Sequence, residues 1–197
     1  MDEIASGILH WTAVHPKIGQ EVSSYWLPGQ RVLLDPITVP DEIADVDEIL
    51  LTNRHHLRAS LEARDRLEAV IRAPRTGMHE YTDGEPVEPY DFGDSLAGGQ
   101  VIAYEIGSIS PDEAALHIPA VSALAVADGV IHYDEGLSFV PDGLMDDPDE
   151  TKRGLAAAYA RLSDELRFEN LLTAHGDPIA GGASERLRSF AADAAGG

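Results

Sequence analysis

Three apolar stretches of this sequence end in a side chain that can bind a metal ion or move a proton. The run over residues 49–51 leads into a polar turn that carries His55, a second apolar run ends at Asp128, and a third ends near His175. Imidazole and carboxylate groups are ligands that zinc, iron and manganese accept in proteins. If the three strand ends converge, His55, Asp128 and His175 could hold one divalent metal ion.

Two further histidines are candidates for the same pocket. His56 adjoins His55, and His117 follows the acidic pair Asp112 and Glu113. Either histidine could complete a ligand set, but each also has a structural explanation, because histidines often serve as surface or strand-pairing residues. His56 and His117 are therefore pocket candidates and not assigned ligands.

Hydrophobic patterns predict the elements that must position these residues. Strands are expected over residues 7–14, 21–27, 31–35, 49–51, 69–72, 100–106, 114–119, 122–129 and 168–174. The third of these strands also finishes on an aspartate, Asp35. Helices are expected to begin near Leu57, Pro148 and Ser184, and residues 82–89 are expected to form a loop because they are rich in Gly, Pro and acidic groups. This order predicts an α/β (α+β) fold with two sheets flanked by helices.

Composition restricts the class of protein. The chain has 197 residues, no cysteine, and 35 acidic against 14 basic residues, which gives a formal charge of −21. The length indicates one domain over residues 1–197. A strongly negative surface repels phosphate backbones and anionic lipid, so we expect no nucleic-acid and no membrane partner. An acidic surface with two lysines also fits adaptation to high salt.

Several common sites are excluded. Without cysteine there is no disulfide and no thiolate ligand. The sequence has no His-Glu-x-x-His, no phosphate loop, no dinucleotide-binding glycine motif and no Gly-x-Ser-x-Gly elbow. No apolar run approaches the ~18 residues of a membrane span. We therefore expect a cytoplasmic protein that binds a small molecule, with either no cofactor or a single zinc, iron or manganese ion.

The order of elements and motifs resembles the metallo-β-lactamase superfamily. The similar parts are a β-meander followed by three strand ends, namely Thr52-Asn53-Arg54-His55-His56-Leu57-Arg58, Ala127-Asp128-Gly129 and Ala174-His175-Gly176-Asp177-Pro178. The resemblance covers nearly the whole chain and implies a four-layer αββα sandwich. It also implies hydrolase chemistry, in which metal-activated water attacks an ester, thioester, amide or phosphoester.

The first ligand motif of that superfamily, His-x-His-x-Asp-His, is matched only in part. Aligned on Thr52, His55 keeps the second histidine, but Asn53 replaces the first. Leu57 stands where the metal-binding, water-activating aspartate belongs, and Arg58 replaces the last histidine. The segment therefore keeps one of its usual ligands.

The later motifs are also matched in part. Ser108 stands where a Gly-His motif supplies a further histidine, whereas Asp128 matches the aspartate that bridges two metals and His175 matches the terminal histidine. Each of the two family metal sites would keep one histidine and the shared aspartate, fewer than the about three protein ligands of a catalytic zinc. Arg58 adds a fixed positive charge, which could pair with Asp128.

These departures favour a metallo-β-lactamase-fold protein with a degraded dinuclear site. Such a protein would be non-catalytic or would bind a small anionic metabolite in a pocket that includes Arg58, His55 and Asp128. The alternative is a metal-dependent hydrolase with a rebuilt single-metal site, in which His55, Asp128 and His175 hold the ion with help from His56 or His117.

Overall fold

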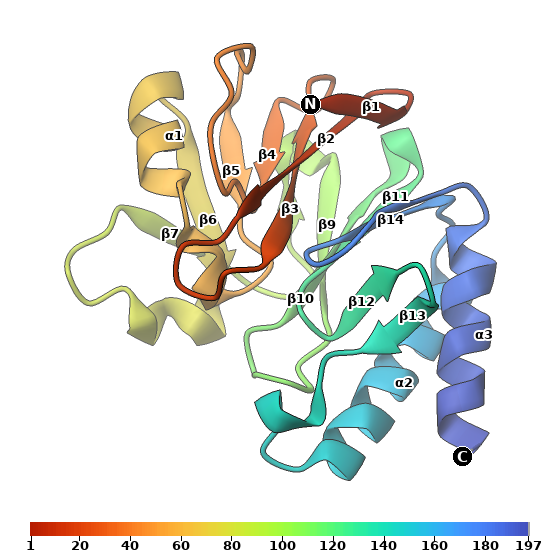
Figure 1. Cartoon of the computed structure of the whole chain (residues 1–197). Coiled ribbons are helices and arrows are strands. Elements are labelled where there is room, and N and C mark those ends of the chain that lie inside the picture. The colour runs from red at the N-terminus through yellow and green to blue at the C-terminus, as the bar shows by residue number, and fades with distance from the viewer. Residues whose placement is uncertain (197) are drawn as a thin grey trace.

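Two β-sheets pack face to face in the computed structural model, which describes residues 1–196 (Figure 1). The first is a seven-stranded sheet whose strands follow one another in chain order: β1 (Asp2–Ala5), β2 (Ile8–Val14), β3 (Glu21–Leu27), β4 (Val32–Leu34), β5 (Glu48–Leu50), β6 (Val70–Pro74) and β7 (Val87–Tyr90). Strands β1 to β4 form an antiparallel meander, whereas β4 to β7 run parallel. The carboxyl ends of β4 and β5 therefore lie side by side.

The second sheet has six strands in the order β15-β14-β11-β10-β9-β8. Their bounds are β8 (Ser95–Leu96), β9 (Val101–Glu105), β10 (Ala114–Ile118), β11 (Ala123–Val126), β14 (Asn170–Thr173) and β15 (Ile179–Ala180). Strands β11 and β14 are parallel neighbours, so their carboxyl ends also lie at one edge. A separate hairpin of β12 (Val130–Tyr133) and β13 (Gly136–Phe139) follows β11.

Helices cover the outer faces of both sheets. Figure 1 shows α1 (Ser60–Leu67) beside the first sheet, and α2 (Pro148–Glu165) and α3 (Ala183–Gly196) on the side of the second. Short 3-10 turns occur in the connections: η1 (Arg54–Leu57), η2 (Arg75–Glu80), η3 (Ala97–Gly99), η4 (Pro119–Val121) and η5 (Asp142–Leu144). No helix within residues 1–196 is long and apolar enough to cross a membrane.

Local sequence explains how α2 begins and which face it buries. The Asp147 side chain accepts a hydrogen bond from the Glu150 amide at 3.0 Å, and Pro148 occupies the first turn. Leu155, Tyr159 and Leu162 are three or four residues apart, so they share one face, and all three are fully buried. That face packs against the second sheet and α3.

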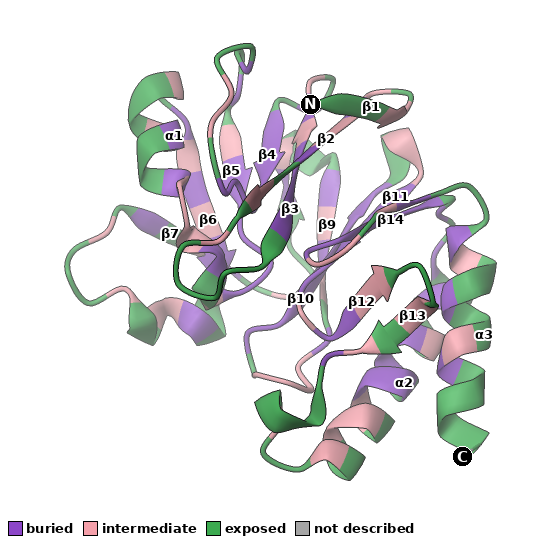
Figure 2. Ribbon diagram, in the orientation of Figure 1, coloured by how far each residue is buried: buried purple, intermediate pink, exposed green. Residues whose placement is uncertain are grey.

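Three apolar cores separate four layers. Leu50 and Leu116 belong to the core between the sheets, Tyr159 and Leu187 to the core under α2 and α3, and Ile71 to the core under α1. Figure 2 shows the buried residues on the central strands and the exposed ones on the outer faces of the helices. The αββα sandwich predicted from the sequence is confirmed.

Two predicted boundaries are wrong. Part of the loop expected over residues 82–89 is the edge strand β7, which tolerates Pro89 because an edge strand leaves one row of backbone groups unpaired. The first helix begins at Ser60 and not at Leu57, because residues 54–57 form the 3-10 turn η1.

Candidate functional site

The loops that follow four strands meet at one place. Asp35 follows β4, η1 follows β5, Asp128 follows β11 and His175 follows β14. One ligand atom from each of His56, Asp128 and His175 lies within 4.8 Å of the others. These three residues are called the triad below.

The 3-10 geometry of η1 decides which histidine joins the triad. The Asn53 side chain caps the turn by accepting a hydrogen bond from the His55 amide at 2.9 Å. A 3-10 helix has three residues per turn, so Asn53 and His56 point to the same side. His56 is buried, whereas His55 is exposed and lies outside the triad. The structure thus brings His56, and not the expected His55, next to Asp128 and His175.

His56 is held at both ring nitrogens. Its Nδ1 lies 3.0 Å from Asp35 Oδ2 and 2.9 Å from Thr52 Oγ1, and its Nε2 lies 3.1 Å from Asp128 Oδ1. Burial and the positive charge of Arg58 act to lower the pKa of His56, but the carboxylates of Asp35 and Asp128 outweigh them and raise it to about 9. The ring is therefore an imidazolium at neutral pH in the metal-free protein.

Asp35 and Thr52 hold the His56 ring in this position. The Thr52 amide donates to Asp35 Oδ1 at 2.9 Å, and the Thr52 hydroxyl donates to Asp35 Oδ2 at 2.6 Å. Burial disfavours the Asp35 carboxylate, but His56 and Arg58 lower its pKa. The sequence predicted Asp35 only as the end of a strand. Asp128 was predicted as a candidate ligand from the same pattern, an apolar run that ends on an acid.

Asp128 is the centre of the triad. Its Oδ1 lies 3.1 Å from both His56 Nε2 and His175 Nε2, and its Oδ2 accepts a hydrogen bond from the Asn53 side-chain nitrogen Nδ2 at 2.8 Å. Burial opposes the charge, but His56 and His175 hold the pKa of Asp128 well below its usual range. The side chain is 25% exposed, so the triad is open to solvent on one side.

His175 is positioned by contacts of the loop that carries it. Gly176 O accepts a hydrogen bond from Ser23 Oγ of β3 at 3.0 Å. The β12 strand bonds the same loop, since the His132 amide donates to His175 O at 3.3 Å and the Asp177 amide donates to His132 O at 2.8 Å. Gly176 has φ +77° and lies so close to His132 O that a side chain there would collide with it.

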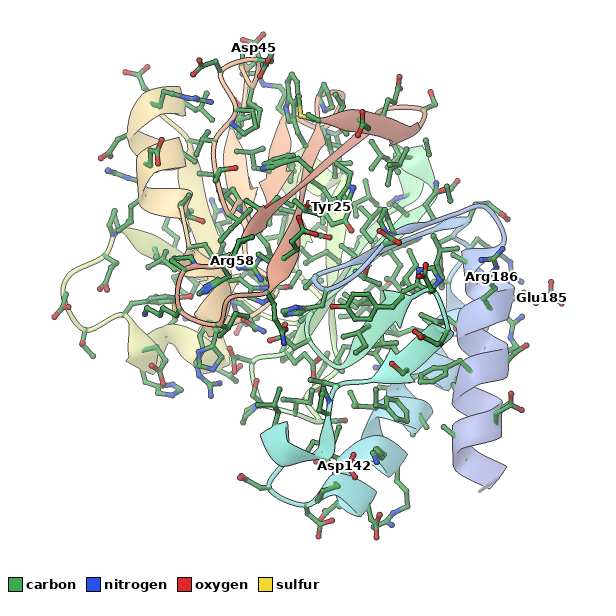
Figure 3. All side chains as sticks on the ribbon, in the orientation of Figure 1. Tyr25, Asp45, Arg58, Asp142, Glu185 and Arg186 are labelled. Carbon is green, nitrogen blue, oxygen red and sulfur yellow. The ribbon has the colours of Figure 1, made fainter. Side chains whose placement is uncertain are left out.

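Arg58 lies beside the triad but does not neutralise Asp128. One guanidinium nitrogen donates to Asp35 O at 3.1 Å and to Ser23 O at 3.3 Å. Figure 3 labels the Arg58 side chain, which lies close to the β2–β3 hairpin. No ion pair joins Arg58 to Asp128 in the described part of the chain. The expected Arg58–Asp128 pair is therefore wrong, because two histidines and Asn53 already occupy that carboxylate. Burial and the charge of Arg58 lower the pKa of His15, so this cation also faces the β2–β3 hairpin.

The other predicted residues lie elsewhere. His117 is on β10, where its Nε2 lies 3.0 Å from Arg167 O. Ser108 packs against Gly154 of α2 and bonds Ile106 O at 3.2 Å. Leu57 joins the apolar core under α1. Neither His117 nor Ser108 belongs to the triad.

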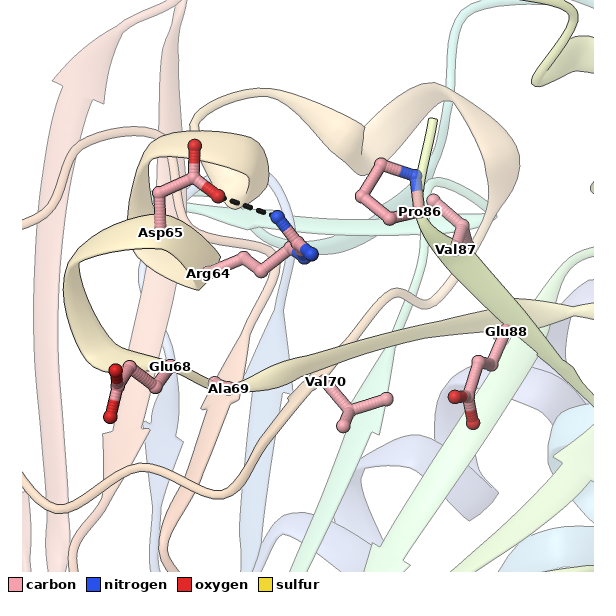
Figure 4. Close-up of a pocket in the computed structure, with 8 residues that line it drawn as sticks. All are labelled: Arg64, Asp65, Glu68, Ala69, Val70, Pro86, Val87 and Glu88. Carbon is pink, nitrogen blue, oxygen red and sulfur yellow. Dashed lines mark hydrogen bonds and ion pairs between the residues drawn. The ribbon is translucent and has the colours of Figure 1, made fainter. Parts of the chain in front are cut away.

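A hollow of about 560 Å³ beside α1 is a separate feature of the surface (Figure 4). Its lining includes Arg64, Glu68, Val87 and Glu88, with Arg64 paired to Asp65 at 2.6 Å. None of the triad residues lines it. The hollow therefore has no part in the chemistry of the triad.

The triad fits one divalent metal ion. Two imidazoles and one carboxylate form a ligand set that iron(II) and zinc accept. Histidines that bind metals usually have their other ring nitrogen bonded to a carboxylate, and Asp35 does this for His56. The side of Asp128 away from the histidines bonds Asn53.

Comparison with solved structures identifies the fold. A metallo-β-lactamase superfamily protein of Sulfolobus tokodaii, ST1585, has a TM-score of 0.69 at 14% identity, over 95% of this chain and 85% of that chain. TTHA1623, in a di-iron-bound form, has a TM-score of 0.65 at 18% identity, over 91% of this chain and 99% of that chain. Rubredoxin oxygen:oxidoreductase from Desulfovibrio gigas has a TM-score of 0.64 at 14% identity.

This chain is shorter than the last of these proteins. The match covers 97% of this chain but only 61% of the oxidoreductase chain. No protein-family profile and no curated protein sequence matches this sequence. Identities this low show the fold alone, and the fold is that of the metallo-β-lactamases.

Proposed function

We propose that this metallo-β-lactamase-fold chain binds one divalent metal ion through the triad and is a metal-dependent hydrolase. The observation that carries the proposal is the double contact of His56, whose Nδ1 meets Asp35 while its Nε2 meets Asp128. Such a contact fixes the ring before a metal arrives. The substrate classes that fit are the ester, thioester, amide and phosphoester that the fold resemblance implies.

The ion would supply the acidity of a bound water, since zinc with three protein ligands lowers the pKa of water to about 7. The chain's own residues do the positioning. Asp35 orients His56, Asn53 orients the Asp128 carboxylate, and Ser23 fixes the loop of His175. Leu57 provides no water-activating carboxylate, so in this proposal activation depends on the ion alone.

A second candidate function is a non-catalytic pocket for a small anionic metabolite. Arg58 favours it, because its guanidinium lies beside an imidazolium in a chain of formal charge −21. Its Nε is buried without a hydrogen-bond partner among the described residues. In this function the dinuclear site of the family would be degraded, and Arg58 would hold a carboxylate or phosphate.

Elemental analysis tests the first proposal. Untagged protein dialysed against metal-free buffer and then loaded with zinc should retain about one equivalent. His56→Ala and His175→Ala should each abolish retention, whereas His55→Ala, which removes an exposed neighbour, should leave it unchanged. Retention that survives both triad variants would overturn the ligand set.

The same proteins separate the two functions. If wild type retains no metal, titration with inorganic phosphate should show binding that Arg58→Ala weakens at least tenfold. If it binds neither metal nor phosphate, both proposals fail.

A further inference from the structure

Two adjacent buried acids just before β10 have no role in the site described so far. Asp112 is 0% exposed and Glu113 is 1% exposed. Burying an ionisable group costs free energy unless the group has hydrogen-bond partners. The partners of these two acids therefore show which segments they hold in place.

Asp112 holds η1. Its Oδ2 accepts a hydrogen bond from the Arg54 amide at 2.6 Å, and its Oδ1 pairs with the Arg54 guanidinium and accepts from Ser110 Oγ at 2.8 Å. A side chain at Gly77 would meet Asp112 Oδ2 at 2.8 Å, so η2 packs closely on the same carboxylate. The Ala114 amide adds a bond of 2.9 Å to Thr52 O. The turn that carries Asn53 and His56 is thus fastened to β10.

Glu113 holds the other side of the triad. Its Oε1 accepts a hydrogen bond from the Gly129 amide at 2.6 Å, in the peptide that follows Asp128. Its Oε2 accepts a longer bond of 3.4 Å from the Ile109 amide. A side chain at Gly129 would meet Leu155 Cδ2 at 2.5 Å and Glu113 Oε1 at 2.6 Å, so the peptide is packed tightly between the carboxyl group and α2.

We infer that Asp112 and Glu113 are positioning residues that set the distance between the two ligand-bearing loops. The two side chains have partners on different loops, since Asp112 accepts hydrogen bonds from Arg54 of η1 and Glu113 accepts one from the Gly129 amide after Asp128. The two residues that precede β10 thereby fix both His56 and Asp128. The effect of these residues on metal binding rests on the proposed function. Their effect on the two loops can be measured in the metal-free protein.

Hydrogen exchange of the metal-free protein tests the fixing directly. Glu113→Asp is one methylene shorter and should raise exchange at amides 127–131 at least tenfold, leaving residues 53–57 unchanged. Glu113→Gln keeps the reach and should leave both segments near wild type. Asp112→Ala should show the opposite pattern, with faster exchange at 53–57 only. Exchange that is unchanged, or that rises evenly over the chain, would mean that the pair is merely structural.

Zinc affinity by chelator competition gives the second readout, at a temperature where every variant is folded. Loss of an outer partner of a metal ligand weakens affinity about 10–100-fold, so we expect that loss in Glu113→Asp and recovery to within about threefold in Glu113→Gln. His117→Ala is the matched control, because it removes another buried polar group of β10 that bonds Arg167 O.

The outcomes separate the two proposals. Equal losses of zinc affinity in Glu113→Asp and His117→Ala would overturn the positioning role. A wild type without zinc affinity would refute the metal proposal, and the exchange pattern would still decide the positioning role. If Asp112→Ala does not fold, the Glu113→Asp and Glu113→Gln pair decides it.

Discussion

At the scale of single residues, His56 couples the charge of the site to the stability of the fold. Its imidazolium lies 3.0 Å from Asp35 and 3.1 Å from Asp128, both of which are carboxylates in the folded protein. A histidine whose pKa is higher in the folded state than in the unfolded state binds a proton more tightly when folded. The proton on His56 therefore stabilises the metal-free protein.

This predicts a loss of stability at high pH. The contribution of His56 is fully present below its unfolded pKa of about 6.5 and is lost as the pH rises through the folded pKa of about 9. Between pH 6 and 10, the free energy of urea unfolding of the metal-free wild type should fall by on the order of 3 kcal/mol more than that of His56→Gln, which does not titrate. Equal slopes in the two proteins would contradict the raised pKa.

Arg58→Ala should destabilise the fold by about 1–3 kcal/mol, because a charged donor to two backbone carbonyls is lost but no carboxylate is left without a partner. Arg66→Ala is the matched control, since Arg66 also donates to backbone carbonyls, those of Val39, Pro40 and Ile43, at a more exposed position. We expect its cost to be below about 1 kcal/mol. Urea unfolding of both variants checks this, and a loss above about 4 kcal/mol for Arg58→Ala would indicate a buried charge left unpaired.

At the scale of elements, the short turn η1 explains which part of the site could be read from the sequence. The strand ends predicted Asp128 and His175, because an apolar run that stops at a polar residue marks the carboxyl end of a buried strand. The choice between His55 and His56 depends on the backbone of four residues, where extended and 3-10 geometries expose opposite side chains. Hydrophobic periodicity carries no signal over so short a segment.

The long-range contacts of the site could not be predicted from the sequence. The sequence shows Asp112, Glu113 and Asp35 as acids near strand ends, but their partners depend on how loops from both sheets meet. The edge strand β7 was missed for a related reason. Its Pro89 and neighbouring acids suit an edge and a loop equally well.

The β14–β15 connection allows a test of close packing at one glycine. Gly176 and Gly181 have similar positive φ values, +77° and +82°, but only at Gly176 would a side chain strike the backbone of β12. Gly181→Ala should cost about 1 kcal/mol from the left-handed backbone alone. Gly176→Ala should cost more than about 3 kcal/mol, measured by urea unfolding. Similar losses in the two variants would show that the His132–Gly176 contact is loose.

At the scale of the whole molecule, the excess of acidic residues predicts a dependence on salt. The formal charge of −21 on 197 residues means that negative side chains repel one another across the surface. Salt screens this repulsion, because the screening length falls from about 10 Å at 0.1 M to about 3 Å at 1 M salt. The melting temperature should rise by several degrees between low salt and 1 M KCl. A flat response would count against salt adaptation, and an equal rise in sucrose would point to solvent exclusion instead.

The bond between Ser23 Oγ and Gly176 O joins residues 153 positions apart, and it lies next to His175. Contacts between such distant segments close large loops, and the entropy lost in closing them slows folding. Fixing the His175 loop in place therefore requires the closure of a large loop. A growing polypeptide cannot bring the three triad residues together until His175 has left the ribosome, long after His56 has done so.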